Sequence, residues 1–275
     1  MKTKLLGLLA GVISLGTAGV ASAADMAVKA RPLPPPVAVF SWTGCYIGGN
    51  VGWAQGDVHS DSLANAAALA GVNGPGFIAV QATSSVTNRP DGVTAGVGVG
   101  CNYQTGAFVI GAEGDINYSD LGFSQIRGPF PTPTSTPHTW EERFHSNWFA
   151  TARARAGVVF AERNLLYVTG GAAFAEYNWL KALDFPGFVG FRYQGSFDDT
   201  RVGWVVGAGW EYAFTNNWSA KVEYLHMDFG NTSAVAVQNT PGSPFAMTHT
   251  VRFREDVVRV GINYRFGGGP VVAKY

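Results

Sequence analysis

Alternation of apolar residues with glycine is the feature that most limits what this chain can fold into. In residues 92–103, one parity holds Val93, Ala95, Val97, Val99, Cys101 and Tyr103, and the other holds glycine, threonine and asparagine. Because successive side chains of a β-strand point to opposite faces, this run has one apolar face and one nearly bare face. We therefore predict a strand with its apolar side outward.

The same two-residue alternation recurs along the chain and predicts eight strands. The runs are residues 43–53, 92–103, 107–118, 148–160, 165–178, 201–214, 218–228 and 256–266. The run at 165–178 is apolar on both parities, so its facing is left unassigned.

Composition decides between the two ways of crossing a membrane. The chain is 47% hydrophobic and only 14% charged, yet no uninterrupted apolar run of transmembrane-helix length follows residue 23. A closed barrel is the other structure that satisfies every backbone group in hydrocarbon. A soluble barrel or sandwich is the alternative, but its interior would hold large apolar residues where this chain has glycine.

Connections between the runs alternate in length. Residues 104–106, 161–164 and 215–217 are short, whereas 54–91, 119–147, 179–200 and 229–255 are long. Outer-membrane barrels have short periplasmic turns and long extracellular loops. The fold class predicted is all-β, an eight-stranded antiparallel up-and-down transmembrane β-barrel with both termini in the periplasm.

Aromatic residues gather where the runs end, as expected for the two girdles of a transmembrane barrel. They are Trp42, Tyr46, Trp53, Tyr103, Tyr118, Trp148, Phe160, Phe214, Trp218, Tyr264 and Phe266.

The N-terminus has the pattern of an export signal. Lys2 and Lys4 precede an apolar stretch that closes on Ala21, Ser22 and Ala23, which predicts a signal peptide over 1–23 in preference to a transmembrane helix. Residues 24–41 are a proline-rich periplasmic leader, 42–266 the barrel and 267–275 a C-terminal extension. Without Lys2 and Lys4, the 19 basic residues become 17 against 19 acidic ones, which gives no attraction to nucleic acid.

Charged residues of both signs fall on the inferred lumen face. They are Glu113, Asp115, Arg153, Arg155, Glu211, Lys221, Glu223, Arg259 and Arg265. Two interpretations stand: a charge-lined permeation path, or a plug of paired charges, since eight strands leave an interior just wide enough for side chains to fill. The plug is favoured.

Cysteine and histidine patterns suggest no catalysis. Cys45 and Cys101 lie on the first two strands, and either a disulfide or two unpaired lipid-facing thiols fits their positions. Of His59, His138, His145, His226 and His249, all but His226 fall in predicted loops without metal or haem spacing. We find no serine, histidine and acid constellation, and expect no enzyme, cofactor or metal.

Two segments carry a family resemblance. Residues 42–50, WTGCYIGGN, and 201–228, containing VGWVVGAGWEYAFTNNW and AKVEYLHMDFG, resemble the small outer-membrane β-barrel surface antigens of α-proteobacteria, of the opacity-type porin family with OmpA- and OmpX-like barrels. The last run resembles the signal read by the barrel assembly machinery, through Arg259, Gly261, Tyr264 and Phe266. The family pattern often stops at that phenylalanine, whereas this chain continues to Tyr275.

The resemblance implies a surface antigen of the Gram-negative cell envelope. We predict a structural, surface-exposed integral protein of the bacterial outer membrane that contributes to envelope integrity. A narrow passive porin is the alternative, and a loop-mediated adhesin or ligand-binding protein is the second, using loop residues such as Phe130, His138, Trp140, Phe185 and Phe188. Expected partners are outer-membrane lipid and lipopolysaccharide, the assembly machinery and nearby peptidoglycan; the oligomeric state is left open.

Overall fold

The computed structural model of the chain describes residues 40–71, 74–133, 136–187, 191–239 and 243–266. The predicted signal peptide, residues 24–39 of the leader and the C-terminal extension lie outside the described residues. No helix in the described part is long and apolar enough to cross a membrane.

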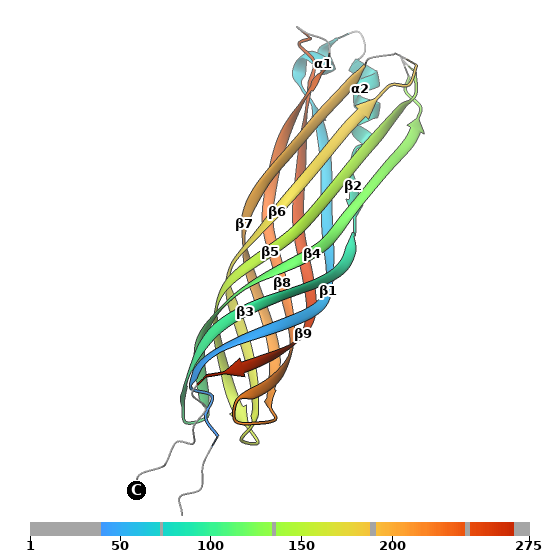
Figure 1. Ribbon diagram of the computed structural model, residues 1–275. Helices are drawn as coiled ribbons and strands as arrows, with labels where there is room; N and C mark the ends of the chain where they lie inside the picture. The colour runs from blue at the N-terminus through green and yellow to red at the C-terminus, as the bar shows by residue number, and fades with distance from the viewer. Residues whose placement is uncertain (1–39, 72–73, 134–135, 188–190, 240–242, 267–275) are drawn as a thin grey trace, which may run out of the picture. The chain divides into compact units, whose positions relative to one another are not determined.

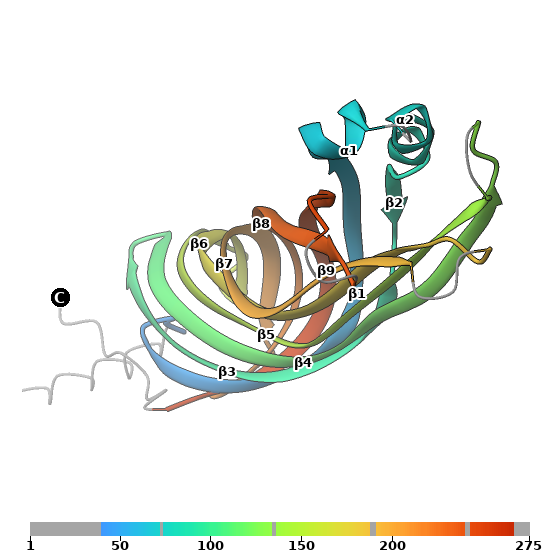
Figure 2. The same cartoon turned by 90° about the horizontal axis from the view of Figure 1, so that it is seen from above.

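Eight long antiparallel strands close into a ring, which confirms the predicted fold (Figures 1 and 2). The order is β1-β3-β4-β5-β6-β7-β8-β9, and β9 pairs with β1. A ninth, short strand and two helices lie between β1 and β3. The elements are β1 (Gly44–Ala64), α1 (Ala66–Ala70), α2 (Gly74–Ala82), β2 (Val86–Asn88), β3 (Asp91–Thr105), β4 (Phe108–Phe130), β5 (His138–Phe160), β6 (Asn164–Asp184), β7 (Arg192–Ala213), β8 (Trp218–Gln238) and β9 (Ala246–Arg265).

An outward apolar belt marks the membrane-spanning segments. Exposed apolar side chains dominate the outer face of residues 45–53, 93–103, 108–118, 148–160, 166–174, 202–214, 218–224 and 258–266. Aromatic residues border this belt on both sides, with the exposed Phe160 and Trp218 on the short-turn side and the exposed Trp53 and partly exposed Trp148 on the other. Since short turns face the periplasm, Trp53 and Trp148 mark the outer leaflet.

Most of the predicted long loops are strand, and this part of the sequence interpretation was wrong. β4 continues past Tyr118 to Phe130, and β5 already begins at His138. Along β4 the inward parity changes from the polar Ser119 to the buried Leu121 and the partly buried Phe123, and the outward parity turns polar at Asp120. Alternation therefore persists, whereas the apolar outer face that defined each run ends at the membrane surface.

The run at 165–178, whose facing was left unassigned, follows the same rule. Leu165, Tyr167 and Ala173 are buried inside the barrel, whereas Leu166 and Val168 are exposed on the lipid face. Both parities are apolar because one packs in the lumen and the other contacts lipid.

Irregularities in the pairing begin at the outer edge of the belt. Register shifts follow Tyr118 in the β4–β5 pair and Asp228 in the β8–β9 pair, and β7 and β8 are unpaired between Gln194 and Trp204. The β3–β4 ladder ends at Thr94 and Ser119, beyond which β2 pairs with β1. Unpaired backbone groups are too costly in hydrocarbon, so breaks are tolerated where water reaches the strands.

Candidate functional site: the ion-paired barrel interior

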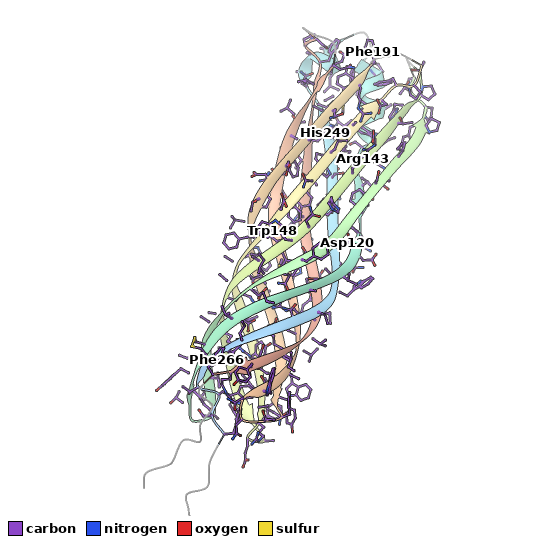
Figure 3. The ribbon with its side chains drawn as sticks, viewed as in Figure 1. Asp120, Arg143, Trp148, Phe191, His249 and Phe266 are labelled. Atoms are coloured by element: carbon purple, nitrogen blue, oxygen red, sulfur yellow. A yellow bond between two sulfur atoms is a disulfide. The ribbon has the colours of Figure 1, made fainter. Side chains whose placement is uncertain are left out.

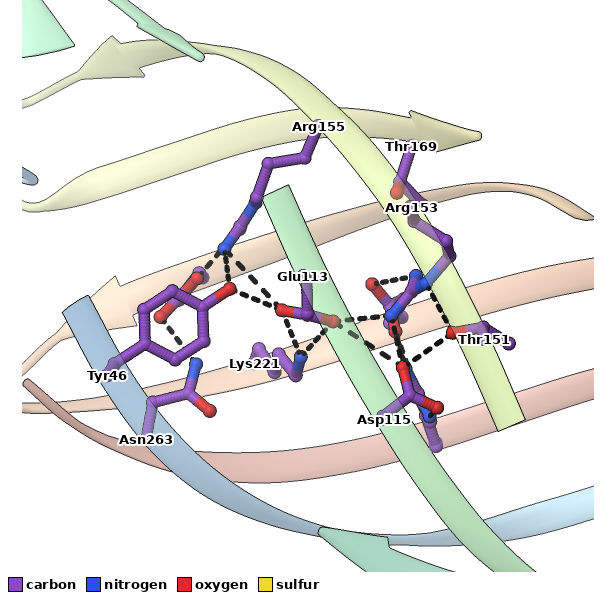
Figure 4. A network of polar contacts seen from close by, with 12 residues as sticks. Tyr46, Glu113, Asp115, Thr151, Arg153, Arg155, Thr169, Lys221 and Asn263 are labelled. Carbon is purple, nitrogen blue, oxygen red and sulfur yellow. Dashed lines mark hydrogen bonds and ion pairs between the residues drawn. The ribbon is translucent and has the colours of Figure 1, made fainter. Parts of the chain in front are cut away.

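The lumen within the membrane belt is filled by charged side chains. All nine residues predicted for the lumen are buried. Eight of them, the four acids Glu113, Asp115, Glu211 and Glu223 and the four bases Arg153, Arg155, Lys221 and Arg259, form a single connected set, here called the ion network (Figure 4). Its formal charges balance.

Arg153 lies at the centre of the ion network. Its guanidinium donates to Asp115 over 2.7 Å and to Glu223 over 3.0 Å, and it also contacts Glu113 closely. Arg259, from the far side of the barrel, binds Glu223 at 2.6 Å and Asp115 at 3.1 Å. β4, β5, β8 and β9 are thereby joined across the lumen.

The other half of the network is centred on Glu113 and Glu211. Lys221 lies 3.0 Å from a Glu113 oxygen, and Arg155 lies 2.8 Å from Glu211. The Tyr46 hydroxyl donates to Glu113 and accepts from Arg155 over 3.0 Å, so it links the two carboxylates.

Neutral groups satisfy the remaining carboxylate lone pairs. Ser219 and Asn263 donate to Glu211 over 2.6 and 2.8 Å, Tyr167 donates to Glu223 over 3.0 Å, and Thr151 donates to Asp115 over 2.8 Å. Buried charges are tolerated when they are paired and hydrogen-bonded, which is the state of all four acids.

Little space remains inside the network. The cavity lined by Tyr46, Glu113, Asp115, Lys221 and Arg259 has a volume of about 10 Å³, roughly that of one water probe. Glycine leaves room for these side chains, because a Cβ at Gly100 would lie 2.5 Å from the Tyr46 hydroxyl oxygen. The glycines of the polar parity are therefore sites of close packing.

Arg265, the ninth predicted lumen charge, forms no hydrogen bond or ion pair with any of these eight residues. It donates to the carbonyls of Ser41 and Asn216 over 2.6 and 2.7 Å, and its guanidinium lies over the rings of Phe40 and Trp42. It therefore closes the periplasmic end of the lumen. The sequence pattern correctly places Arg265 on the lumen face. It does not show that Arg265 lies apart from the ion network, near the periplasmic end.

The proposed assembly signal is split between two faces. Tyr264 and Phe266 lie on the lipid face, where Tyr264 packs edge-to-face on Trp218, whereas Arg259 belongs to the ion network. A Cβ at Gly261 would approach the Gly49 carbonyl oxygen within 2.9 Å, so close strand packing requires this glycine.

Cys45 and Cys101 are joined by a disulfide between β1 and β3. They are register partners with Cα atoms 3.9 Å apart. Sequence analysis leaves the pairing open because strand register is not visible in the alternation.

Above the ion network, an aromatic layer fills the lumen. Tyr177 stacks on Phe253 with ring centroids 4.7 Å apart and contacts Phe144 and Phe229 at 5.4 and 5.1 Å. Glu255, which shares the inward parity of Phe253, is buried here, and neither carboxylate oxygen has a hydrogen-bond partner among the described residues. This layer was missed because Phe144, Phe229, Phe253 and Glu255 fall in segments interpreted as loops, and Tyr177 falls in the run whose facing was left unassigned.

At the extracellular end, α2 packs against the barrel interior. The loop residues expected to offer a ligand site lie here, but they pack on one another. Trp140 is buried in one apolar cluster with Phe77 of α2, and Phe130 and Phe185 pack against that cluster. His138 is buried between the rings of Phe130, Trp140 and Phe185. Phe188 lies outside the described residues.

The histidines expected in loops lie on strands. His59 is on β1, His138 and His145 are on β5, and His249 is on β9. His249 Nδ1 lies 2.7 Å from Ser62 Oγ, a serine–histidine pair that the sequence did not reveal. Both residues are buried, and no described carboxylate bonds His249, so the pair lacks the orienting acid of a hydrolase triad.

Comparison with known proteins agrees with this architecture. A family model described as outer membrane protein beta-barrel domain matches residues 13–266. The chain belongs to this family. The 31 kDa outer-membrane immunogenic protein of Brucella melitensis is 33% identical over 97% of this chain and 100% of its own length. The 25 kDa outer-membrane immunogenic protein of Brucella abortus is 26% identical over 90% of this chain and 91% of its own.

Neisserial surface protein A is a solved structure with some likeness to this one. It is 13% identical, covers 78% of this chain and 97% of its own, and gives a TM-score of 0.32. The assignment of the fold rests on the strand pairing described above and on the family match. The protein is an integral β-barrel of the bacterial outer membrane, and the predicted family resemblance is confirmed.

Proposed function

We propose that this protein is a structural, surface-exposed outer-membrane barrel that contributes to envelope integrity, conducts no solutes and catalyses no reaction. The ion network is the observation that supports this proposal most directly. Every carboxylate in it is bound by a cation, and the cavity within it measures about 10 Å³.

Passage of an ion through the lumen would require the network to break. Separating a buried ion pair leaves uncompensated charges and costs about 3–5 kcal/mol. Beyond the network, the permeant ion would meet the aromatic layer around Tyr177 and Phe253, where stacked rings and the buried Glu255 offer few groups to replace its hydration. Two successive barriers of different chemistry argue for a closed barrel over a narrow passive porin.

The part of the barrel above the outer girdle supports a role at the cell surface. β1, for example, extends eleven residues beyond Trp53, with Asp57, His59 and Asp61 on its outer face. Two relatives are named for their immunogenicity. From this likeness we propose that the part of the barrel above the outer girdle, here called the extended wall, is exposed to antibodies.

The belt and the C-terminal strand suggest the partners. Outer-membrane lipid and lipopolysaccharide would contact the apolar belt, and the barrel assembly machinery would bind Tyr264 and Phe266, which project from the lipid face. We propose proximity to peptidoglycan because the described part of the barrel begins at Phe40 and ends at Phe266, both at the periplasmic end.

Conductance in a planar bilayer tests the closed state. We expect no channels from the purified, refolded mature chain, and openings after Arg153→Ala, which removes the central cation of the network. Steady openings of the unaltered chain, seen in preparations with verified folding, would establish a pore and overturn the proposal.

A deletion strain tests the contribution to the envelope. Loss of the gene is expected to increase sensitivity to detergents, and complementation with either the unaltered chain or Arg143→Ala, an outward change, should restore resistance. Unchanged detergent resistance in the deletion strain would refute the structural role.

A further inference from the structure

A turn from the β1–β3 connection is held inside the extracellular end of the barrel by buried titratable groups. Thr83 and Ser84, which directly follow α2, are the residues held. The Lys181 ammonium donates to the Ser84 carbonyl over 2.7 Å, and His138 Nε2 lies 2.7 Å from Thr83 Oγ1. Trp140 Nε1 also donates to Thr83 Oγ1, over 3.1 Å. We call this set of contacts the latch.

His249 supports the latch from β9, near the extracellular end of the barrel (Figure 3). Its Nδ1 is 2.7 Å from Ser62 Oγ, and the Ser62 amide donates to Ser84 Oγ over 3.1 Å. His249 Nε2 is buried without a partner among the described residues. A proton added to this ring would therefore bring a charge that no described carboxylate contacts, with Lys181 close by.

The charges around the latch are mostly positive. Lys181 and Arg127 face it from β6 and β4, and Arg127 donates to the carbonyls of Thr83 and Ser84 over 3.3 and 3.4 Å. Glu142 is the nearest acid, but its oxygens accept from Trp179 and Asn88. The other charged groups at this end pair elsewhere: Glu141 with Arg143 and Arg192, Asp184 with Arg192, and Asp61 with His59.

We propose that His138 and His249 make the latch proton-sensitive. When both histidines are neutral, they hold α2 and the Thr83–Ser84 turn in the mouth of the barrel. When they are protonated at low pH, this segment is released. Release would uncover Phe77 and Val80 of α2 and the apolar wall around Trp140 and Met247. The ion network below stays in place, so release changes the exposed surface without opening a path through the barrel.

The sign of the pH dependence follows from burial. Burial lowers the pKa of His138, and burial together with Lys181 lowers the pKa of His249 to about 3. Both histidines lie beyond the membrane belt. A released, hydrated histidine titrates near its ordinary value, so the released state binds more protons between about pH 6.5 and pH 3. The latched state therefore loses stability as pH falls through this window.

Hydrogen exchange of the refolded mature chain in lipid nanodiscs tests the latch. After correction for intrinsic exchange, amides of residues 74–84 should open about thirtyfold more at pH 5.0 than at pH 7.5 if one histidine governs release. Amides of the membrane belt should not change. Unchanged opening in the unaltered chain would overturn the proposal without any variant.

Three variants locate the proton. His138→Gln and His249→Gln keep a neutral hydrogen-bonding side chain and should each reduce the pH dependence, and the double variant should abolish it. His59→Gln is the matched control, because His59 lies on the outer face of β1 and is exposed. Full pH dependence in a folded double variant would assign release to other groups and refute the histidine latch.

Discussion

Glu113 on β4 and Arg153 on β5 are register partners whose side chains form an ion pair in the middle of the barrel. Pairing of neighbouring strands thus puts the two charges together, and the closed ring then brings Glu223 and Arg259 to the same place. The ion network is therefore a product of local register and of barrel closure.

Loss of Arg153 should destabilise the barrel strongly. Arg153→Met leaves Glu113, Asp115 and Glu223 with one cation fewer, and we expect a loss of about 3–5 kcal/mol in the free energy of unfolding. Urea unfolding of the refolded protein, followed by the gel shift between folded and unfolded forms, measures it. Arg143→Met is the control: the Arg143 side chain is 63% exposed and, among the described residues, pairs with Glu141 alone, so less than about 1 kcal/mol should be lost. Equal losses in the two variants would contradict a central role for Arg153.

Gly100 should tolerate no side chain. In Gly100→Ala, the new Cβ would lie 2.5 Å from the Tyr46 hydroxyl oxygen and would displace the group that links Glu113 to Arg155. We expect a loss of about 1–3 kcal/mol. At Gly114, the nearest atom to a new Cβ is the Thr151 carbonyl oxygen at 3.6 Å, so Gly114→Ala should change stability by less than about 0.5 kcal/mol. The same urea titration compares them, and a Gly100→Ala barrel as stable as the unaltered one would show that Tyr46 is free to move.

The sequence predicted the membrane part of the fold well because lipid imposes a simple rule. Between Val93 and Tyr103 the outer face must be apolar at every second position, so facing and strand count are visible directly. The nine lumen charges were found for the same reason. Pairing of Glu113 and Asp115 with Arg153 on the next strand follows from the pattern, whereas contacts such as Arg259 to Asp115 were not predictable because they depend on closure of the ring.

Outside the membrane the rule no longer holds, and there the sequence interpretation failed. Asp120 on β4 and Thr200 on β7 are polar and outward, so their strands resemble loops. The inward residues Leu121 of β4 and Tyr193 of β7 are buried and apolar, so the alternation continues on a single parity, and this was the available signal. The latch was also hidden, because Thr83 and Lys181 are far apart in the sequence.

Glu255 should make stability fall as pH rises. Burial, with Asp256 adding to it, raises the pKa of Glu255 from near 4.5 to about 8. The group lies beyond the membrane belt. Between these pH values the folded protein keeps a proton that the unfolded chain releases, so the free energy of unfolding should drop by about 1.4 kcal/mol per pH unit.

The Glu255→Gln variant isolates this contribution. It cannot titrate, so its stability relative to the unaltered chain should be constant below about pH 4.5 and should rise through the window up to about pH 8. Urea titrations at pH 4, 6 and 8 give the difference. A difference independent of pH would mean that Glu255 is hydrated or paired in the folded protein.

Labelling of intact cells should distinguish the two ends of the barrel. Thr200 is exposed on β7 beyond the outer girdle, whereas Glu162 is exposed in the short turn between β5 and β6. Both native cysteines are in the disulfide, so an introduced cysteine is the reactive thiol. A membrane-impermeant maleimide should label Thr200→Cys on intact cells and Glu162→Cys only after the outer membrane is opened, because short turns face the periplasm. Labelling of Glu162→Cys on intact cells, with Thr200→Cys protected, would invert the orientation and remove the support for a surface role of the extended wall.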